Sequence, residues 1–102
     1  MLTSLYGLAR GAPFAMEPED AHEFSLRMLE RGLYPRDASA DTSELATELF
    51  GLRFPNPIGI AAGYDKDARV PDAVLGLGCG FAEVGTITPL PQSGNPRPRV
   101  FR

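Results

Sequence analysis

Apolar positions in the first third of the chain recur at helical spacing. Those at positions 2, 5, 6 and 9 predict a short amphipathic helix over residues 1–10, which Gly11 and Pro13 would end. A second helix is predicted from Pro18 to Arg31. Its proline suits a first turn, acidic residues follow it, arginines lie near the far end, and the glycine after Arg31 can terminate it.

The second helix has more apolar surface than one packing seam requires. This surplus is consistent with an oligomer contact, a gate for a hydrophobic ligand, or a patch that rests on lipid. Packing of both helices within their own domain explains it equally well, so the pattern alone leaves these alternatives open.

The middle of the chain changes to short extended segments. Residues 35–43 are polar and predict a connection, after which residues 45–50 and 52–54 predict a small hairpin with its turn near Gly51. Prolines at positions 55 and 57 follow directly. Because proline cannot donate to a β-ladder, we expect this hairpin at an edge or as a cap.

A strand, a helix and a second strand are predicted next. Residues 58–62 are continuously apolar, as in a parallel strand covered on both faces, residues 67–76 return to helical spacing, and residues 81–85 form another apolar run. Two strands and one helix cannot cover both faces of a parallel sheet. We therefore expect an α/β fold that is incomplete on its own, a fragment or a chain that folds beside another carrying the remaining strands.

Composition narrows the possible functions only moderately. A length of 102 residues suits one domain, 10 prolines and 11 glycines predict much irregular loop, and a net charge of −3 argues against a general nucleic-acid binder. The single cysteine, Cys79, excludes an internal disulfide and predicts a buried or half-buried structural thiol in a reducing compartment. Neither a signal peptide nor a membrane-spanning run is apparent, which predicts a cytoplasmic or peripheral protein.

Small residues follow both predicted strands, where α/β folds place their ligands. Ala61, Ala62 and Gly63 end the first strand, and Gly85 and Thr86 end the second. A flat ring system could lie against them, although tight packing of a helix on the strand would need the same small residues.

Lys66 adds a cation three residues after this first group. It could stabilise developing negative charge on a ring or bind a substrate carboxylate, or it could be a solvated loop lysine. Asp65 and Asp67 fit turn and N-cap positions better than a catalytic pair, and His22 fits a plain surface residue. The sequence shows no phosphate loop, Ser-His-Asp order or histidine-rich metal cluster. The arginines of GNPRPRVFR favour anion or lipid-headgroup contact, or a rigid connector, equally.

Three stretches of the sequence together resemble a known family. They are EDAHEFSLRMLERG, NPIGIAAGYDK and GFAEVGTITPLPQSGNPRPRVFR. The chain resembles the N-terminal part of a dihydroorotate dehydrogenase of class 2, the membrane-associated and quinone-dependent class. The resemblance implies the N-terminal portion of a (β/α)8 TIM barrel, preceded by a small helical domain and a bottom-capping β-hairpin. Residues 1–43 would form the helical quinone- and membrane-facing domain with its linker. Residues 44–102 would form the hairpin and the first two βα units.

The resemblance also implies two groups of site residues. The FMN contacts would be Ala61, Ala62, Gly63, Tyr64, Asp65, Lys66, Gly85 and Thr86, with Lys66 also binding the carboxylate of orotate. The quinone tunnel would be lined by Ala21, His22, Ser25, Met28, Leu29, Leu33 and Arg102. Tyr64 and Cys79 are mild departures, since the family commonly has phenylalanine or leucine at the first position and phenylalanine at the second.

The implied reaction is the oxidation of dihydroorotate to orotate in de novo pyrimidine biosynthesis. A serine base removes a proton, hydride passes to FMN, and ubiquinone or a related quinone reoxidises the flavin. The serine, the substrate-binding asparagines and the flavin phosphate site would lie beyond residue 102, so no catalytic base is assigned here. No metal ligand is predicted. The implied partners are dihydroorotate, a quinone, the remaining barrel segment, possibly as a separate chain, and the cytoplasmic face of a bacterial membrane, with no nucleic acid.

Two other functions fit the residues. The helices could bind lipid or a partner with the βα unit as a non-catalytic scaffold. Alternatively, Lys66 could act as a Schiff-base nucleophile in a phosphate-handling barrel, although it lies past the strand end.

Overall fold

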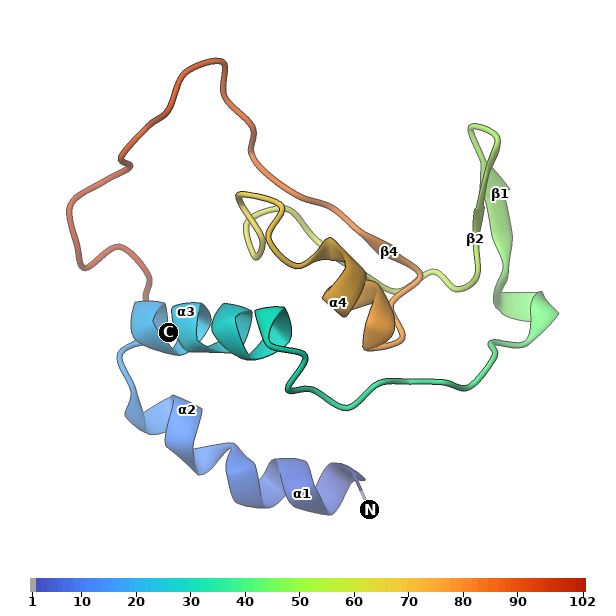
Figure 1. Cartoon of the computed structure of the whole chain (residues 1–102), viewed down its shortest axis with the longest axis horizontal. Coiled ribbons are helices and arrows are strands. Elements are labelled where there is room, and N and C mark those ends of the chain that lie inside the picture. The colour runs from blue at the N-terminus through green and yellow to red at the C-terminus, as the bar shows by residue number, and fades with distance from the viewer. Residues whose placement is uncertain (1) are drawn as a thin grey trace.

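The computed structural model describes residues 2–102 as three helices, a hairpin and one βα unit (Figure 1). In chain order the elements are α1 (Leu2–Ala9), α2 (Gly11–Ala15), α3 (Pro18–Glu30), the 3₁₀ turn η1 (Ser43–Leu45), β1 (Thr47–Leu49), β2 (Leu52–Phe54), β3 (Gly59–Ile60), α4 (Pro71–Gly76) and β4 (Phe81–Ala82).

The first helical segment differs from the prediction at its end. Gly11 and Pro13 do not terminate it but lie inside α2, which follows α1 almost directly. Proline is tolerated there because it is the third residue of α2, where the N–H of a helix has no intrahelical partner. Backbone bonds from Arg10 N–H to the Tyr6 carbonyl (2.9 Å) and from Phe14 N–H to the Arg10 carbonyl (3.3 Å) bridge the junction.

Helix α3 confirms the predicted second helix to within one residue at its end. Pro18 occupies the first turn with acidic residues beside it, and the helix ends at Glu30. Gly32 has a φ of +71°, its N–H donates to the Leu29 carbonyl (3.0 Å), and Leu33 N–H donates to the Met28 carbonyl (2.9 Å). This is the Schellman arrangement, which satisfies carbonyls that the helix end would otherwise leave unpaired.

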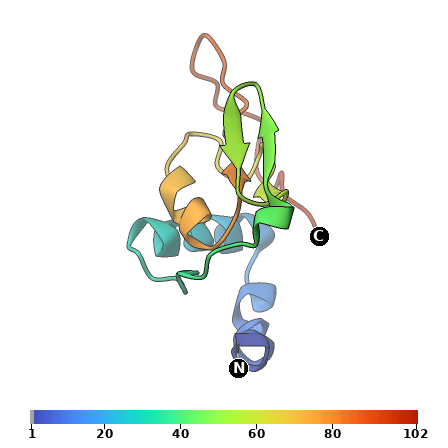
Figure 2. The same cartoon turned by 90° about the vertical axis from the view of Figure 1, so that its right-hand side faces the viewer.

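The predicted hairpin is present and projects away from the helices (Figures 1 and 2). Strands β1 and β2 pair antiparallel, with Leu49 opposite Leu52, and residues 43–45 form η1 instead of extending the first strand. Phe50 and Gly51 both have positive φ, the conformation of a two-residue turn that matches strand twist. Its place as the cap of a barrel stays a prediction.

The βα unit is parallel, as predicted, but each of its elements is shorter than predicted. Strands β3 and β4 pair only at two positions, and α4 begins at Pro71 instead of residue 67. The late start has a local cause: Ala68 has a φ of +55°, and the side chain of Asp65 binds the backbone N–H groups of Arg69 and Val70. Residues 62–70 thus form a turn between β3 and α4.

One apolar core joins the helical part to the βα unit. Leu26 and Leu29 of α3 pack with Val70, Ala73 and Val74, and the half-buried residues around this core are Tyr34, Ile60, Tyr64, Cys79 and Ala82. Cys79 is half-buried beside this core, as predicted, while its place in a reducing compartment stays a prediction. The division at residue 43 stays a prediction, because this core is built from both sides of it.

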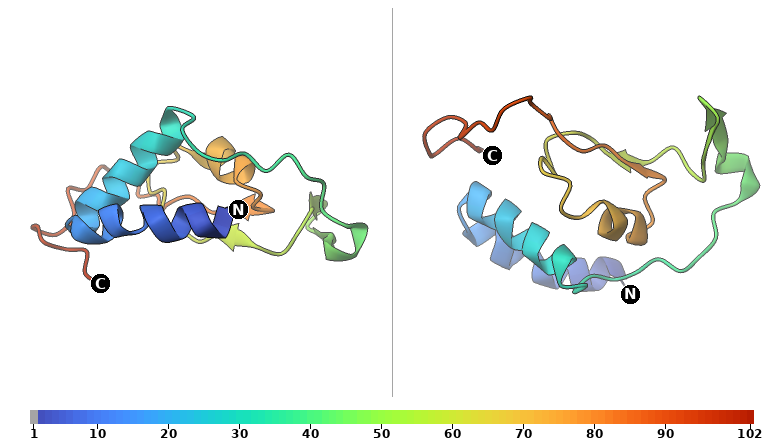
Figure 3. Two further views of the ribbon diagram at one scale, coloured as in Figure 1. Left: turned by 90° about the horizontal axis from the view of Figure 1, so that it is seen from below. Right: turned by 45° about the horizontal axis from the view of Figure 1, so that its top comes forward.

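The other side of the small sheet is open. Ile58 is 69% exposed, and Ala61 and Ala62 at the other end of the predicted first strand are exposed as well, so the expected cover on both faces of this strand is not found among residues 2–102. Figure 3 shows α3 and α4 together on one side of the strands. The described residues are thus a partial α/β unit.

Close packing at Gly80 gives a test of this fold. A Cβ there would overlap the backbone carbonyl of Asn56, while the Gly80 N–H donates to the Ile58 carbonyl (2.8 Å). We expect Gly80→Ala to lower the free energy of unfolding by about 1–3 kcal/mol, measured by denaturant melting.

Gly7→Ala is the matched control, since no atom lies within 4 Å of its added methyl group. This change should leave stability equal or raise it by up to about 1 kcal/mol, because alanine is the better helix former. Equal stability of Gly80→Ala and the unchanged protein would contradict the packing described.

Candidate functional site

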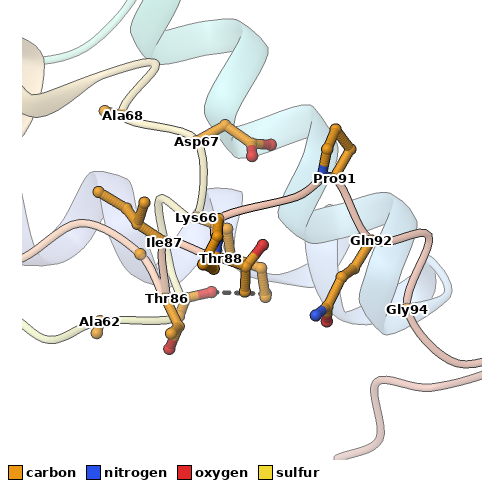
Figure 4. Close-up of a pocket in the computed structure, with 13 residues that line it drawn as sticks. Ala62, Lys66, Asp67, Ala68, Thr86, Ile87, Thr88, Pro91, Gln92 and Gly94 are labelled. Atoms are coloured by element: carbon orange, nitrogen blue, oxygen red, sulfur yellow. Dashed lines mark hydrogen bonds between the residues drawn. The ribbon is translucent and has the colours of Figure 1, made fainter.

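A pocket of about 850 Å³ lies at the carboxyl ends of β3 and β4 (Figure 4). We call it the larger pocket. Five residues of the predicted FMN set line it, namely Ala62, Gly63, Lys66, Gly85 and Thr86. Ala61, Tyr64 and Asp65 do not. The remaining wall comes from Asp67, Ala68, Ile87, Thr88, Pro89, Pro91, Gln92 and Gly94.

Two backbone hydrogen bonds bring the strand ends together. The Gly63 N–H donates to the Gly85 carbonyl (3.0 Å), and the Gly85 N–H donates to the Asp65 carbonyl (3.1 Å). Both glycines have φ above +100°, where a side chain would be strained. The small residues after the two strands therefore form one continuous floor.

The Lys66 ammonium is fixed by a backbone group of the same turn. Its Nζ donates to the Gly63 carbonyl at 2.8 Å. An ammonium has three N–H donors, so two have no protein partner among residues 2–102 and are available to an anion. The side chain borders the larger pocket, where it could bind a carboxylate or stabilise negative charge.

Asp65 has a structural task, which agrees with the turn position predicted for it. The residue is 2% exposed, and its Oδ1 and Oδ2 accept the N–H groups of Arg69 and Val70, both at 2.8 Å. Its carboxylate is thus directed to the turn. The flavin contact of Asp65 stays a prediction, and only the backbone of this residue could make it.

A second pocket of about 490 Å³ adjoins the first, and Lys66, Asp67, Gln92 and Gly94 line both. We call it the smaller pocket. His22 and Tyr64 also border it, together with charged residues of α3 and the C-terminal segment. A residue predicted for the quinone tunnel and one predicted for the FMN site therefore share one wall.

His22, Ser25 and Tyr64 contact one another. His22 Nε2 lies 2.6 Å from the Tyr64 carbonyl, and Ser25 Oγ lies 2.9 Å from the Tyr64 hydroxyl. The rings of His22 and Tyr64 meet edge to face with centroids 5.3 Å apart. His22 is thus more than a plain surface residue, the alternative that its sequence position had favoured.

The other predicted tunnel residues do not line either pocket. Leu29 is buried in the core, Leu33 is 56% exposed, and Ala21 and Met28 are half-buried on α3. The Arg102 guanidinium donates to the carbonyls of Pro13 (2.7 Å) and Met16 (2.8 Å) at the end of α2. Their role as one tunnel stays a prediction.

The arginines of the C-terminal segment bind the helical part of the chain. Arg99 Nε lies 2.8 Å from Glu19 Oε1, and Arg97 Nε lies 3.3 Å from the same oxygen. With Arg102 on α2, they bring residues 97–102 back to the helices, as the path of the chain in Figure 1 shows. The sequence left two roles open for these arginines, contact with an anion or lipid headgroup and a rigid connector. The observed contacts agree with the connector.

Arg69 lines the smaller pocket, although the sequence did not mark it as a site residue. Its guanidinium binds Glu23 through Nη1 (2.9 Å) and Glu30 through Nε (2.8 Å), so it connects the turn to α3. The acidic residues of α3 at positions 23 and 30 lie two helical turns apart, which was the available signal. Hydrogen bonding to Arg69 lowers the pKa of Glu23 from 4.5 to about 2 and also lowers the pKa of Glu30.

Comparison with known proteins shows the family of this chain. The family model described as dihydroorotate dehydrogenase matches residues 44–102. The chain belongs to the dihydroorotate dehydrogenase family. The matched residues include β3, α4, β4 and every residue that lines the larger pocket.

Individual dihydroorotate dehydrogenases match over nearly the whole chain. A dihydroorotate dehydrogenase (quinone) of Parvibaculum lavamentivorans is 60% identical over 98 residues, which are 96% of this chain and 28% of that protein. A mitochondrial dihydroorotate dehydrogenase (quinone) of Cyclocybe aegerita is 58% identical over 95 residues, 93% of this chain and 29% of that protein. These matches confirm the resemblance to the quinone-dependent class.

A solved structure agrees with the fold. The crystal structure of DHODH from Eimeria tenella in complex with ferulenol superposes with a TM-score of 0.80 at 48% identity, covering 84% of this chain and 23% of that one. The chain thus spans about a quarter of the length of the dihydroorotate dehydrogenases that it matches.

The Arg69 ion pairs predict how stability depends on pH. The pKa of Glu23 is lower in the folded state than its ordinary value of 4.5, so its stabilising contribution is complete above about pH 4.5 and is lost as the pH falls toward 2. Arg69→Gln should therefore lower the urea midpoint of unfolding at pH 7. The difference between the midpoints of this variant and the unchanged protein should shrink as the pH falls toward 2.

Arg53→Gln, which removes the same charge from the hairpin, is the control for net charge. It should leave the pH profile unchanged. A destabilisation by Arg69→Gln that is the same at pH 7 and pH 2 would mean that the ion pairs are not its cause.

Proposed function

We propose that this chain is part of a quinone-dependent dihydroorotate dehydrogenase that oxidises dihydroorotate to orotate in de novo pyrimidine biosynthesis. One observation carries the proposal. Five of the eight residues that the family pattern assigns to FMN line a single pocket, and one of the five is Lys66, whose ammonium has two donors without a partner among residues 2–102. Membership of the family indicates which reaction to expect. The presence of these residues in one pocket supports a site for that reaction within the described residues.

The larger pocket fits the ring system of FMN. Its volume of about 850 Å³ lies within the usual range for cofactor sites, roughly 300–1,000 Å³. Ala62, Gly63 and Gly85 leave backbone open to a flat ring, and Thr86 offers a hydroxyl at the rim. Bound FMN would supply a hydride acceptor. Ala62, Gly63, Lys66, Gly85 and Thr86 would bind and orient it.

Lys66 would bind the orotate carboxylate beside the ring. Its ammonium is fixed by the Gly63 carbonyl and has two further donors, which suits a charge-assisted bond to an anion. This role leaves Lys66 as a positioning cation with no covalent step. We assign the serine base to a segment beyond residue 102.

The open side of the sheet would pack against the remaining barrel segment, on the same or a separate chain. Ile58, which precedes β3, and Ile87 and Leu90, which follow β4, are exposed and would become buried there. The expected (β/α)8 barrel needs such cover, because a parallel sheet is buried on both faces.

The quinone would bind on the α3 side of the site, near His22, and the helices would rest on a membrane surface. Tyr6, Leu8 and Phe14 of α1 and α2 are exposed apolar side chains suited to lipid. Within residues 2–102 no helix has the length and apolar character to cross a bilayer. We propose peripheral attachment at the cytoplasmic face of a bacterial membrane, with ubiquinone or a related quinone as acceptor.

The proposal is tested first by colour and reduction. The purified protein with its remaining barrel segment should bind FMN, and dihydroorotate should bleach the flavin absorbance under anaerobic conditions. A folded, colourless protein that does not take up added FMN would rule out this function.

Lys66→Ala should weaken orotate binding to the FMN-loaded protein by roughly 10- to 150-fold, the range for losing a hydrogen bond to a charged group. It should also weaken FMN retention. Orotate titration followed by flavin absorbance measures the first effect, and FMN release on dilution measures the second. Unchanged binding of both ligands would remove Lys66 from the site.

His22→Gln should slow flavin reoxidation by a quinone analogue by about tenfold, the order of losing one hydrogen bond to the quinone. It should spare flavin reduction by dihydroorotate. Glutamine is the informative replacement, because its amide can still donate to the Tyr64 carbonyl that His22 contacts. Stopped-flow measurement of the two half-reactions separates the effects. An equal loss in both would argue against a quinone-side role.

A further inference from the structure

Tyr64 is fixed at both ends by α3. Its carbonyl can only accept a hydrogen bond, so His22 Nε2, 2.6 Å away, carries the proton of that contact. At the other end, Ser25 Oγ lies 2.9 Å from the Tyr64 hydroxyl. One residue of the turn thus has both its backbone and its side-chain tip bound to one helix.

The direction of the Ser25 contact follows from its hydrogen count. Ser25 Oγ donates its single proton to the His22 carbonyl at 2.7 Å. A serine hydroxyl has one proton, so the Tyr64 hydroxyl must be the donor to Ser25. Phenylalanine at position 64 could fill the same volume, but it could not make this bond.

The turn then transmits this attachment to the larger pocket. Gly63 directly precedes Tyr64. The Gly63 N–H donates to the Gly85 carbonyl, and the Gly63 carbonyl accepts a hydrogen bond from the Lys66 ammonium. A shift of Tyr64 would therefore move the floor of the pocket and the cation together.

We propose that Tyr64 is a positioning residue, whose hydroxyl bond to Ser25 sets the place of Gly63 and Lys66 in the larger pocket. Tyr64 itself does not line that pocket, so it acts through the turn and not by touching a ligand there. The consequence for ligand affinity rests on the proposed function, whereas the consequence for the turn does not.

Amide hydrogen exchange tests the turn directly. Tyr64→Phe and Ser25→Ala should each speed exchange of the Gly63 amide about 2- to 10-fold, the range for one neutral hydrogen bond. The Glu83 amide, which donates to the Ile60 carbonyl in the sheet (2.9 Å), should keep its rate. Equal acceleration at both amides would mean general destabilisation and would overturn the proposal.

Orotate titration of the FMN-loaded full protein tests the consequence at the pocket. Both variants should raise the dissociation constant of orotate about 2- to 10-fold, and the double variant should raise it no further, because the two changes remove one shared bond. Tyr34→Phe is the control, since it removes the hydroxyl of another half-buried tyrosine at the same core. Its orotate affinity should be unchanged.

Unchanged orotate affinity in Tyr64→Phe and Ser25→Ala, or an equal loss in Tyr34→Phe, would overturn the positioning role. A protein that binds no FMN would refute the proposed function instead. The exchange rates would then still decide whether Tyr64 fixes the turn.

Discussion

The carboxylate of Asp65 is buried inside the turn that it shapes, and the site depends on this arrangement. Both its carboxylate oxygens accept backbone N–H groups, and its backbone carbonyl accepts the N–H of Gly85, which follows β4. A buried carboxylate is costly unless it is hydrogen-bonded, so the turn is stable only in a shape that supplies these donors. That shape directs Lys66 to the larger pocket and Arg69 to α3.

The turn also explains why the helical part and the βα unit form one body. Tyr64 and Arg69, on either side of Asp65 in the chain, make the polar contacts to α3, while Leu26 and Leu29 pack on Val70 beneath them. The arginines of residues 97–102 add contacts to α2 and α3 from the other end of the unit. The smaller pocket is therefore built against α3, whereas the larger pocket is lined by the turn and by residues after β4.

Much of this architecture could be predicted, where a local rule decides it. The extent of α3 follows from its first-turn proline and terminal glycine, and the hairpin turn follows from Gly51. The small residues after each strand marked the larger pocket. The late start of α4 could not be predicted, because it depends on the Asp65 side chain competing for backbone donors. The Arg69 ion pairs join residues 39 or more positions apart, so the spacing of Glu23 and Glu30 places both on one face of α3 but does not identify their partner.

We propose that one pocket of this chain holds FMN and the carboxylate of orotate together. The most direct measurement is a crystal structure of the protein, assembled with its remaining barrel segment, with FMN and orotate bound. We predict the flavin ring against Ala62, Gly63 and Thr86, with Lys66 Nζ at about 2.7–2.9 Å from a carboxylate oxygen of orotate. Either ligand bound away from this pocket would contradict the account.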